Sequence, residues 1–391
     1  METEMTETDF NSGRCGYWTK FSETKLIQVE KKILNVLKTA YRTWFVPIGS
    51  TVGKDDKIWT IALNEESHNT PLVMLHGFAA GLCFWILNFD ELSKNRPVYA
   101  IDLLGFGRSS RPKFNSNSQE AEQQMVASIE EWRKQMQLER FILLGHSFGG
   151  YLATSYAITY PDRVKHLILA DPWGFQERPA KLNVPLAWKL LAVVFYPLTW
   201  FNPLAGIRAA GPMGPWLVSK VRNDISAKYS DAVDNTDLIT EYIYHCNTQK
   251  PSGEAAFHSM KQGIAWAKNP MMRRYHTLSK TVPLTVIYGE KSWVRKTPTE
   301  DLIKQRPQSY VRTEIIPNAG HHINADQPTI FNQLVSKVCQ LCDNSEDIYI
   351  ESEDKDNPSD PAFDVNEWNK KNEFLIEEDE FNGMQVINTK L

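Results

Sequence analysis

The sequence lacks the cysteine content of a disulfide-stabilised protein. Its five cysteines are an odd number and are scattered over 391 residues, whereas small secreted scaffolds carry paired cysteines at close spacing. Cys339 and Cys342 lie close together, but no second cysteine pair or histidine cluster accompanies them. We therefore interpret them as residues near a helix end, and we expect a reducing compartment and no metal site.

The sequence also lacks a secretory signal and a clear transmembrane segment. The stretch 1–4 is acidic and no apolar core follows it. The apolar stretch 184–201 reaches only the lower length limit for a membrane span, and Lys189 and two prolines interrupt it. The sequence therefore predicts a cytoplasmic protein that binds a membrane or lipid droplet peripherally, with mitochondrial association as a further option.

Before Asp343, acidic residues are fewer than basic ones, although the net charge of the whole chain is −4. The segment from Asp343 onward carries fifteen acidic residues and four lysines, which leaves the preceding body positively charged. We predict that residues 344–391 form a disordered tail. A basic body suits an anionic lipid surface, and an ordinary soluble enzyme is the alternative. We expect no nucleic-acid partner.

One stretch, 141–150, combines a buried strand with a nucleophile motif. Four apolar residues precede Gly145-x-Ser147-x-Gly149, and a helical run follows. This order is typical of a nucleophile elbow, in which a strained strand-to-helix turn lifts the serine hydroxyl out of the sheet. The two glycines leave room for that turn, because a Cβ at either position would crowd the neighbouring backbone. The motif alone is common, but in this context it predicts Ser147 as a catalytic nucleophile.

Two further segments supply the groups that a serine nucleophile requires. A strand at 71–75 ends in His-Gly-Phe78, where hydrolases of this class build half of an oxyanion hole. We therefore predict that the backbone N–H groups of Phe78 and Phe148 stabilise the developing negative charge. A histidine after the last strand is the expected base, and we choose His321 over its neighbour His322 because it directly follows a glycine turn.

The spacing of strands and helices predicts an α/β-hydrolase fold, with a mostly parallel central sheet and helices on both faces. The strand–helix rhythm stops at about 176–280, which predicts a helical cap over the site. An apolar cap fits an acyl chain, since burial of each CH₂ contributes ~0.8 kcal/mol, and plain core packing is the alternative. We divide the chain into an N-terminal segment (1–55), a hydrolase domain (56–343) and the tail (344–391).

The N-terminal segment contains an amphipathic pattern. From Glu23 to Phe45, apolar residues recur at helical spacing with lysines between them, which predicts an amphipathic helix. One interpretation is an interfacial helix with Trp18 and Trp44 at the level of the lipid head groups. The other is a helix that packs on the core of the protein itself.

Five longer sequence segments indicate a more specific resemblance. They are Asn95 to Ala100, Asp102 to Pro112, Asp171 to Phe175, Phe201 to Gly206 and Glu241 to Asn247. With these segments, the chain from about Lys57 to Asp343 resembles the family of α/β-hydrolase domain-containing proteins four and five.

That family contains a lyso-N-acylphosphatidylethanolamine lipase and a lipid-droplet co-activator of triglyceride lipase, which is also described as a lysophosphatidate acyltransferase. The resemblance implies that Ser147 is the nucleophile and His321 the base. The co-activator branch has asparagine at the nucleophile position, so Ser147 favours the hydrolase branch. His321 and Asp326 also fit an H-x₄-D motif of acyltransferase type, although Asp326 alternatively caps the helix that follows.

One position departs from the family pattern. The resemblance implies a triad acid shortly after Tyr288-Gly289, behind an aromatic-aliphatic pair, but here Trp293-Val294 is followed by Arg295. A cation at that position cannot stabilise a histidinium. We predict Asp171, at the end of the preceding core strand, as the acid. The alternatives are Glu290, Glu300, Asp301 or the absence of a working acid.

The leading hypothesis is a serine hydrolase of acyl lipids that acts on (lyso)phospholipid or N-acyl phospholipid bonds without a metal or prosthetic group. The alternatives are a lysophosphatidic acid acyltransferase, with acyl-CoA as co-substrate, and a non-catalytic lipid-droplet co-activator of a triglyceride lipase. The expected partners are a phospholipid or lysophospholipid substrate, a droplet or membrane surface and, for the co-activator, a lipase.

Overall fold

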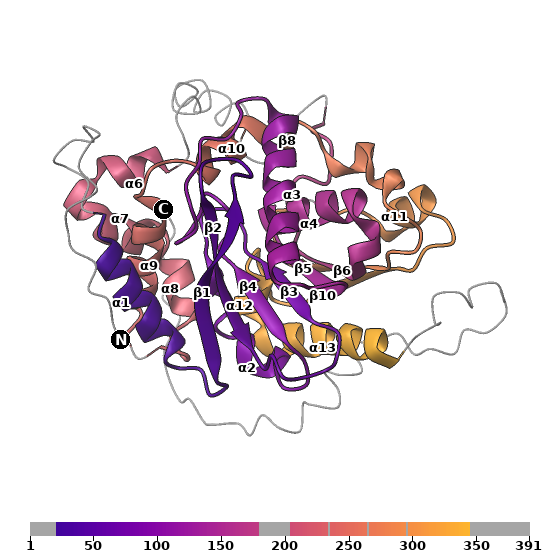
Figure 1. Cartoon of the computed structure of the whole chain (residues 1–391), viewed down its shortest axis with the longest axis horizontal. Helices are drawn as coiled ribbons and strands as arrows, with labels where there is room; N and C mark the ends of the chain where they lie inside the picture. Colours follow the sequence, from indigo (N-terminus) through magenta and orange to yellow (C-terminus); the bar gives the residue numbers. More distant parts are fainter. Residues whose placement is uncertain (1–20, 180–203, 234, 264–265, 295, 345–391) are drawn as a thin grey trace, which may run out of the picture. The chain divides into compact units, whose positions relative to one another are not determined.

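A central eight-stranded sheet organises the described part of the chain in a computed structural model, which describes residues 21–344 except 180–203, 234, 264–265 and 295 (Figure 1). The strand order is β1-β2-β4-β3-β5-β6-β9-β10. β1 and β2 pair antiparallel with each other and β2 pairs antiparallel with β4, whereas the other neighbours are parallel. The strands are β1 (Tyr41–Gly49), β2 (Asp56–Leu63), β3 (Leu72–Leu75), β4 (Val98–Ile101), β5 (Phe141–His146), β6 (Val164–Ala170), β9 (Leu284–Gly289) and β10 (Val311–Ile316).

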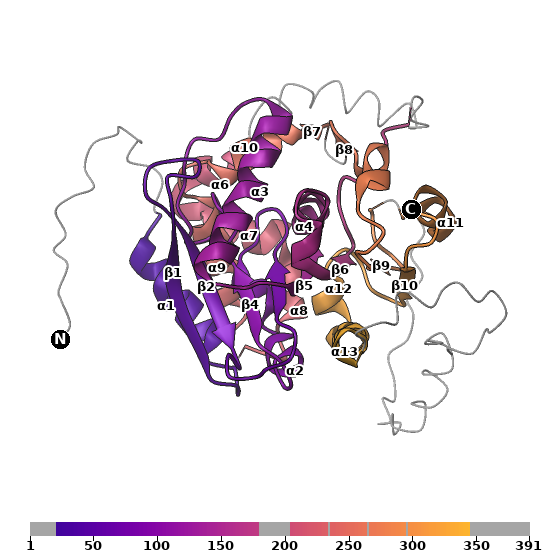
Figure 2. The same ribbon diagram turned by 45° about the vertical axis from the view of Figure 1, so that its right-hand side comes forward.

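Helices cover both faces of this sheet. α3 (Ser118–Gln135) and α4 (Phe148–Thr159) lie on one face, and α2 (Phe89–Leu92) and α13 (Pro328–Asn344) lie on the other (Figure 2). The inner strands are therefore mostly apolar, because both of their faces are buried. This arrangement confirms the predicted fold class. Shorter elements are η1 (Leu82–Trp85), η2 (Pro161–Arg163), α11 (Thr299–Gln305) and α12 (Ile323–Asp326).

A helical insertion follows β6, within the predicted cap range of 176–280. The apolar stretch 184–201 lies outside the described residues. Within the described residues, no helix is long and apolar enough to cross a membrane. The insertion consists of α6 (Ala205–Ala209), η4 (Gly211–Met213), α7 (Gly214–Val221), α8 (Asn223–Lys228), α9 (Asp237–Asn247), α10 (Gly253–Met260), the hairpin β7 (Lys261–Gln262) and β8 (Trp266–Ala267), η5 (Met271–Arg273) and η6 (Tyr275–Thr277).

The N-terminal helix is shorter than the sequence predicted. α1 spans Glu23–Leu34. Beyond its end, the backbone N–H groups of Lys38 and Thr39 donate hydrogen bonds to the Asp90 carboxylate. Residues 41–49 then form β1 and pair with β2, so the prediction of a helix through Phe45 is wrong. The aromatic and β-branched residues of this stretch favour a strand, and its pairing with β2 decides the outcome. The boundary proposed at residue 55 therefore cuts a β-hairpin of the sheet.

The apolar face of α1 packs on the protein itself. Leu26, Val29 and Ile33 are at most 4% exposed, and α1 contacts α9 of the cap. Glu30 in the same helix accepts hydrogen bonds from Trp59 Nε1 at 3.0 Å and from Arg108 at 2.7 Å. The interfacial-helix interpretation is therefore wrong, and packing on the core is confirmed. Trp44 lies on β1, and Trp18 lies outside the described residues.

Candidate active site

Ser147 sits on a strained turn between β5 and α4. Its φ is +53° and its ψ is −116°, a conformation that costs ~1–3 kcal/mol for a residue with a Cβ. A Cβ on Gly145 or Gly149 would lie 2.4 Å from a backbone oxygen, so both glycines are required by close approach. The turn is held by hydrogen bonds from Ser147 N–H to Ala170 O at 3.0 Å and from Trp173 N–H to Ser147 O at 3.1 Å.

A continuous hydrogen-bond chain links this serine to an imidazole and a carboxylate. His321 Nε2 lies 2.9 Å from Ser147 Oγ, and His321 Nδ1 lies 2.5 Å from Asp171 Oδ2. Ser147 follows β5, Asp171 follows β6 and His321 follows β10, so all three lie at the carboxyl ends of parallel strands, where open α/β sheets place their sites. The structure therefore brings together the three residues predicted from the sequence as nucleophile, base and acid.

Asp171 is fully buried and is held in place by backbone and side-chain donors. Its own N–H donates to Ile287 O at 2.7 Å, which ties the end of β6 to β9. Gly289 N–H donates to Oδ1 at 3.3 Å, and the hydroxyl of Ser292 donates to Oδ2, the oxygen that also contacts His321. Hydrogen bonds from neutral donors stabilise a carboxylate without cancelling its charge.

The alternative acids lie elsewhere. Glu290 accepts the N–H of Asn318 at 2.9 Å and so braces the loop that carries the base. Glu300 and Asp301 are exposed in the first turn of α11. Arg295 lies outside the described residues.

His322, the alternative base, faces the cap rather than the serine. Its Nε2 lies 3.3 Å from a guanidinium nitrogen of Arg222 on the cap. Burial, followed by the neighbouring charges of His146 and His321, holds the pKa of His322 well below its usual value. Of the two adjacent histidines, His321 is thus the one in hydrogen-bond contact with Ser147.

Both amides predicted for the oxyanion hole lie beside the serine. Phe148 is the first residue of α4, directly after Ser147, and Phe78 follows β3. A Cβ on Gly77 would lie 3.1 Å from Ser147 Cβ, so the backbone after β3 passes close to the nucleophile. Within the described part of the chain, neither amide N–H has a hydrogen-bond acceptor. Two such donors match what a tetrahedral oxyanion requires.

His146 is a positioning residue that the sequence analysis did not single out. Its Nε2 donates to the backbone oxygen of His321 at 2.9 Å. Burial, with the charge of His321 as the second cause, lowers the pKa of His146 to about 3. It is therefore neutral near pH 7 and holds the base loop through one N–H donor. It immediately precedes the nucleophile, but only the fold reveals its partner.

Asp326 connects the base loop to the cap. Its Oδ2 accepts the N–H of Gly320 at 2.8 Å, and its Oδ1 lies 2.5 Å from Lys228 Nζ at the end of α8. In the described structure it contacts the backbone beside His321 rather than the imidazole. In the H-x₄-D motif, Asp326 therefore stabilises the turn before His321 and forms an ion pair with the cap.

A cavity of about 980 Å³ opens onto the serine and is lined by Ser147, His321 and the cap. Its described apolar lining comes mainly from the cap and from the loops after β3 and β6. Phe257 of α10 is central, because its ring stacks on Phe78 at 4.2 Å and lies 4.8 Å from Trp173. An apolar cavity of this size next to a serine fits an acyl chain better than a polar substrate. Other apolar side chains of the lining are Phe84, Leu204, Ile207, Leu217, Ile225 and Ile243.

Metal ligands do not gather in the described residues, since no group of three or more His, Cys, Asp or Glu side chains there could hold an ion. Cys339 and Cys342 are buried on the last helix, α13.

Sequence comparison places the chain among known proteins. A family described as "alpha/beta hydrolase fold" matches residues 70–328. The chain belongs to the α/β-hydrolase family. Within this family, the hydrolase is 48% identical over 327 residues to the human "(Lyso)-N-acylphosphatidylethanolamine lipase", covering 82% of this chain and 93% of that protein. It is 47% identical over 327 residues to the mouse "1-acylglycerol-3-phosphate O-acyltransferase ABHD5", covering 82% of this chain and 91% of that protein. The resemblance inferred from the sequence is confirmed.

Solved structures agree with the fold of this α/β-hydrolase. The carboxylesterase CesB from Bacillus subtilis superposes with a TM-score of 0.56 at 18% identity, covering 80% of this chain and 96% of that one. A membrane phospholipase A described as a bacterial virulence factor gives a TM-score of 0.56 at 18% identity, covering 82% of this chain and 92% of that one. At such low identity these structures establish the fold alone.

Proposed function

We propose that this α/β-hydrolase is a serine hydrolase that cleaves the acyl bonds of (lyso)phospholipids or N-acyl phospholipids. The observation that carries the proposal is the hydrogen-bond chain from Ser147 through His321 to Asp171 at the floor of a large apolar cavity. The human lipase relative, which is named for a lyso-N-acylphosphatidylethanolamine substrate, supports this choice of substrate class.

The residues divide the reaction as follows. Ser147 Oγ attacks the acyl carbonyl carbon while His321 Nε2 takes the hydroxyl proton, and Asp171 stabilises the resulting imidazolium. The N–H groups of Phe78 and Phe148 bind the oxyanion, and loss of one such donor costs ~3 kcal/mol of barrier. His321 then protonates the departing group. Water, activated by the same imidazole, finally releases the acid from the serine.

The first test is covalent labelling with a fluorophosphonate probe, combined with hydrolysis of lyso-N-acylphosphatidylethanolamine. We expect wild type to be labelled and active, and Ser147→Ala to lose both. A surface control, Ser230→Ala, should keep both, since Ser230 is exposed on a cap turn. Unlabelled, inactive wild type with an intact fold would reject the hydrolase proposal.

Acyl transfer is the second candidate, because the mouse relative is named as a 1-acylglycerol-3-phosphate acyltransferase. In this proposal acyl-CoA supplies the acyl group and His321 serves as the base. Asp326 would support it by holding the backbone before His321 in place. We expect His321→Ala to abolish transfer and Asp326→Ala to weaken it. Transfer that persists in folded His321→Ala would reject this role.

The third candidate, a non-catalytic co-activator of a lipase, rested on Arg295 as a sign of a lost acid. The carboxylate of Asp171 beside His321 favours an intact triad instead. The measurement is the activity of a triglyceride lipase with and without this protein. If wild type and Ser147→Ala raised that activity equally, the co-activator proposal would be restored.

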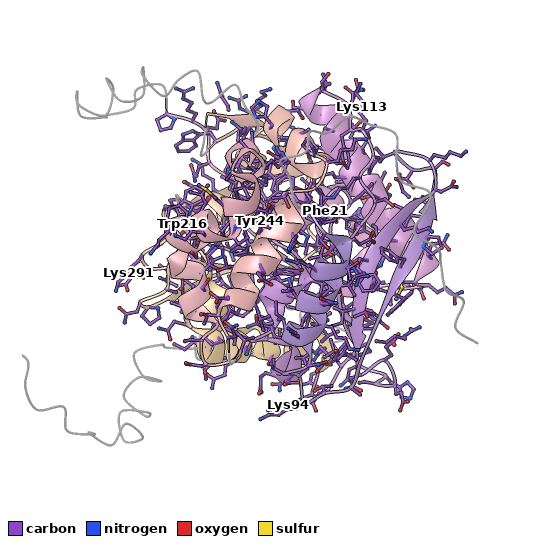
Figure 3. The ribbon with its side chains drawn as sticks, turned by 90° about the vertical axis from the view of Figure 1, so that its left-hand side faces the viewer. Phe21, Lys94, Lys113, Trp216, Tyr244 and Lys291 are labelled. Atoms are coloured by element: carbon purple, nitrogen blue, oxygen red, sulfur yellow. The ribbon has the colours of Figure 1, made fainter. Side chains whose placement is uncertain are left out.

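We also propose peripheral binding to a lipid droplet or membrane through the cap. Met213 and Trp216 are 60% and 58% exposed, and Trp216 marks the outer edge of the cap in Figure 3. Exposed large apolar residues beside a lipid cavity favour contact with a lipid surface. Trp216→Ser should reduce co-flotation with phosphatidylcholine liposomes; unchanged flotation would reject this surface.

A further inference from the structure

One cation that lines the acyl cavity has no acidic partner in the part of the chain that the structure describes. The cavity is lined by Arg222, Lys228 and Lys261. Arg222 pairs with Asp224 at 3.0 Å, and Lys228 pairs with Asp326 at 2.5 Å. Lys261 has no carboxylate within ion-pair distance among the described residues, and its Nζ donates to the backbone oxygen of its own turn at 3.2 Å.

The sequence holds no aspartate or glutamate between Glu254 and Glu290. Neither 180–203 nor 264–265 contains an aspartate or a glutamate. Glu254, an acidic residue of the preceding helix α10, pairs with Arg208 at 2.5 Å. In the described part of the chain, the positive charge of Lys261 is thus not neutralised by a carboxylate.

Two further basic groups lie close to Lys261. Burial, followed by the charge of Lys268, lowers the pKa of Lys261. Burial, followed by the charges of both lysines, lowers the pKa of His258, whose Nδ1 is buried without a hydrogen-bond partner in the described structure. Across the hairpin β7–β8, Lys261 pairs with Ala267, and Lys268 is the next residue along the chain, with its side chain on the opposite face. A bound anion would relieve this repulsion among basic groups.

The position of this cluster relative to the serine suits a substrate with both an acyl chain and a charged group. Lys261 follows α10 four residues after Phe257, which corresponds to about one helical turn. Phe257 contacts the rings of Phe78 and Phe148, whose backbone amides flank Ser147. Lys261 therefore lines the cavity about one helical turn from the aromatic rings beside the reacting centre.

We propose that Lys261 forms a phosphate subsite of the acyl cavity, with the nearby charge of Lys268 adding to the attraction. The acyl chain occupies the apolar lining, its carbonyl meets Ser147, and the phosphate accepts hydrogen bonds from Lys261. This subsite rests on the proposed acyl-lipid function. Both a phospholipid head group and the coenzyme A part of an acyl-CoA offer such a phosphate.

Binding of non-cleavable ligands to full-length Ser147→Ala protein tests the subsite without requiring catalysis. The probes are 1-alkyl lysophosphatidate, 1-alkylglycerol with the same chain, and an S-alkyl-coenzyme A. Adding Lys261→Met should weaken lysophosphatidate binding about tenfold, the loss expected for one charge-assisted hydrogen bond. Alkylglycerol binding should not change. Lys261→Arg should retain most of the lysophosphatidate affinity, and Lys268→Met should show a smaller loss.

Lys113→Met is the matched control, because Lys113 is exposed and lies away from the cavity lining (Figure 3). A selective loss of S-alkyl-coenzyme A affinity instead would assign the same subsite to coenzyme A phosphates. Equal losses for lysophosphatidate and alkylglycerol would show that Lys261 only supports the fold of the cavity, and would overturn the proposal. Absence of binding by all three probes would reject the acyl-lipid function together with the subsite.

Discussion

The carboxyl ends of β6 and β9 lie side by side, yet they give different kinds of group to the same site. The end of β6 gives a charge, the buried carboxylate of Asp171. The end of β9 gives neutral donors to that carboxylate, namely Gly289 N–H and the hydroxyl of Ser292. The two strands are parallel and paired, so both of their ends face the loop that carries His321.

This contrast explains how an active-site arrangement can exist without an acid where the family resemblance places it. The base requires one carboxylate near Nδ1, and either of two adjacent parallel strands can deliver it. A second carboxylate buried next to Asp171 would repel it. A hydroxyl at Ser292 instead stabilises the charge that is already present.

Of the substitutions at the ends of the two strands, Asp171→Asn should cause the largest loss of activity. We expect about a 10⁴-fold loss of kcat, as in serine proteases that lose the triad acid, because an amide cannot stabilise the imidazolium. The measurement is the hydrolysis rate on a lysophospholipid, together with the rate of fluorophosphonate labelling. Asp162→Asn, in the short helix η2, is a matched control that should keep full activity. Full activity of Asp171→Asn would place the working acid elsewhere.

Ser292→Ala should have an intermediate effect. It removes one donor from the carboxylate, and a hydrogen bond to a charged group contributes about 1.5–3 kcal/mol, so we expect at least a tenfold lower kcat. Ser292 acts only through Asp171, so Ser292→Ala should add little to the loss in an Asp171→Asn background. Ser292→Thr, which keeps the hydroxyl, should recover most of the rate. Independent, additive losses would contradict this role.

Patterns within short windows account for what the sequence predicted correctly. The strand at 71–75, the core strand that ends at Asp171 and the nucleophile motif all depend on near neighbours, and the structure has a strand or elbow at each. The stretch 41–45 misled because its apolar residues fit a helical period, whereas its partner strand, β2, follows a loop. Aromatic and β-branched residues fit either pattern until that partner is known.

The roles of Ser292 and His146 could not be predicted for a different reason. Each depends on a partner more than a hundred positions away in the chain, Asp171 for Ser292 and the His321 backbone for His146. Neither residue forms a motif by itself. Asp171 was accessible to prediction because a carboxylate at the end of a core strand is itself a recognisable signal.

Arg295→Asp should have the smallest effect on kcat. It tests most directly whether the acid comes from the segment after β6 or from the segment after β9. With Asp171 already bonded to His321, we expect kcat to change by no more than about threefold, because the base already has a carboxylate at Nδ1. The measurement is lysophospholipid hydrolysis by Arg295→Asp in wild-type and Asp171→Asn backgrounds, with Arg295→Asn as the charge-removal control. If Arg295→Asp raised kcat tenfold in the wild-type background, Asp171 would be a structural residue and the acid position of the family would still be the functional one. If it instead restored activity only in Asp171→Asn, the ends of β6 and β9 would be interchangeable sources of the same carboxylate.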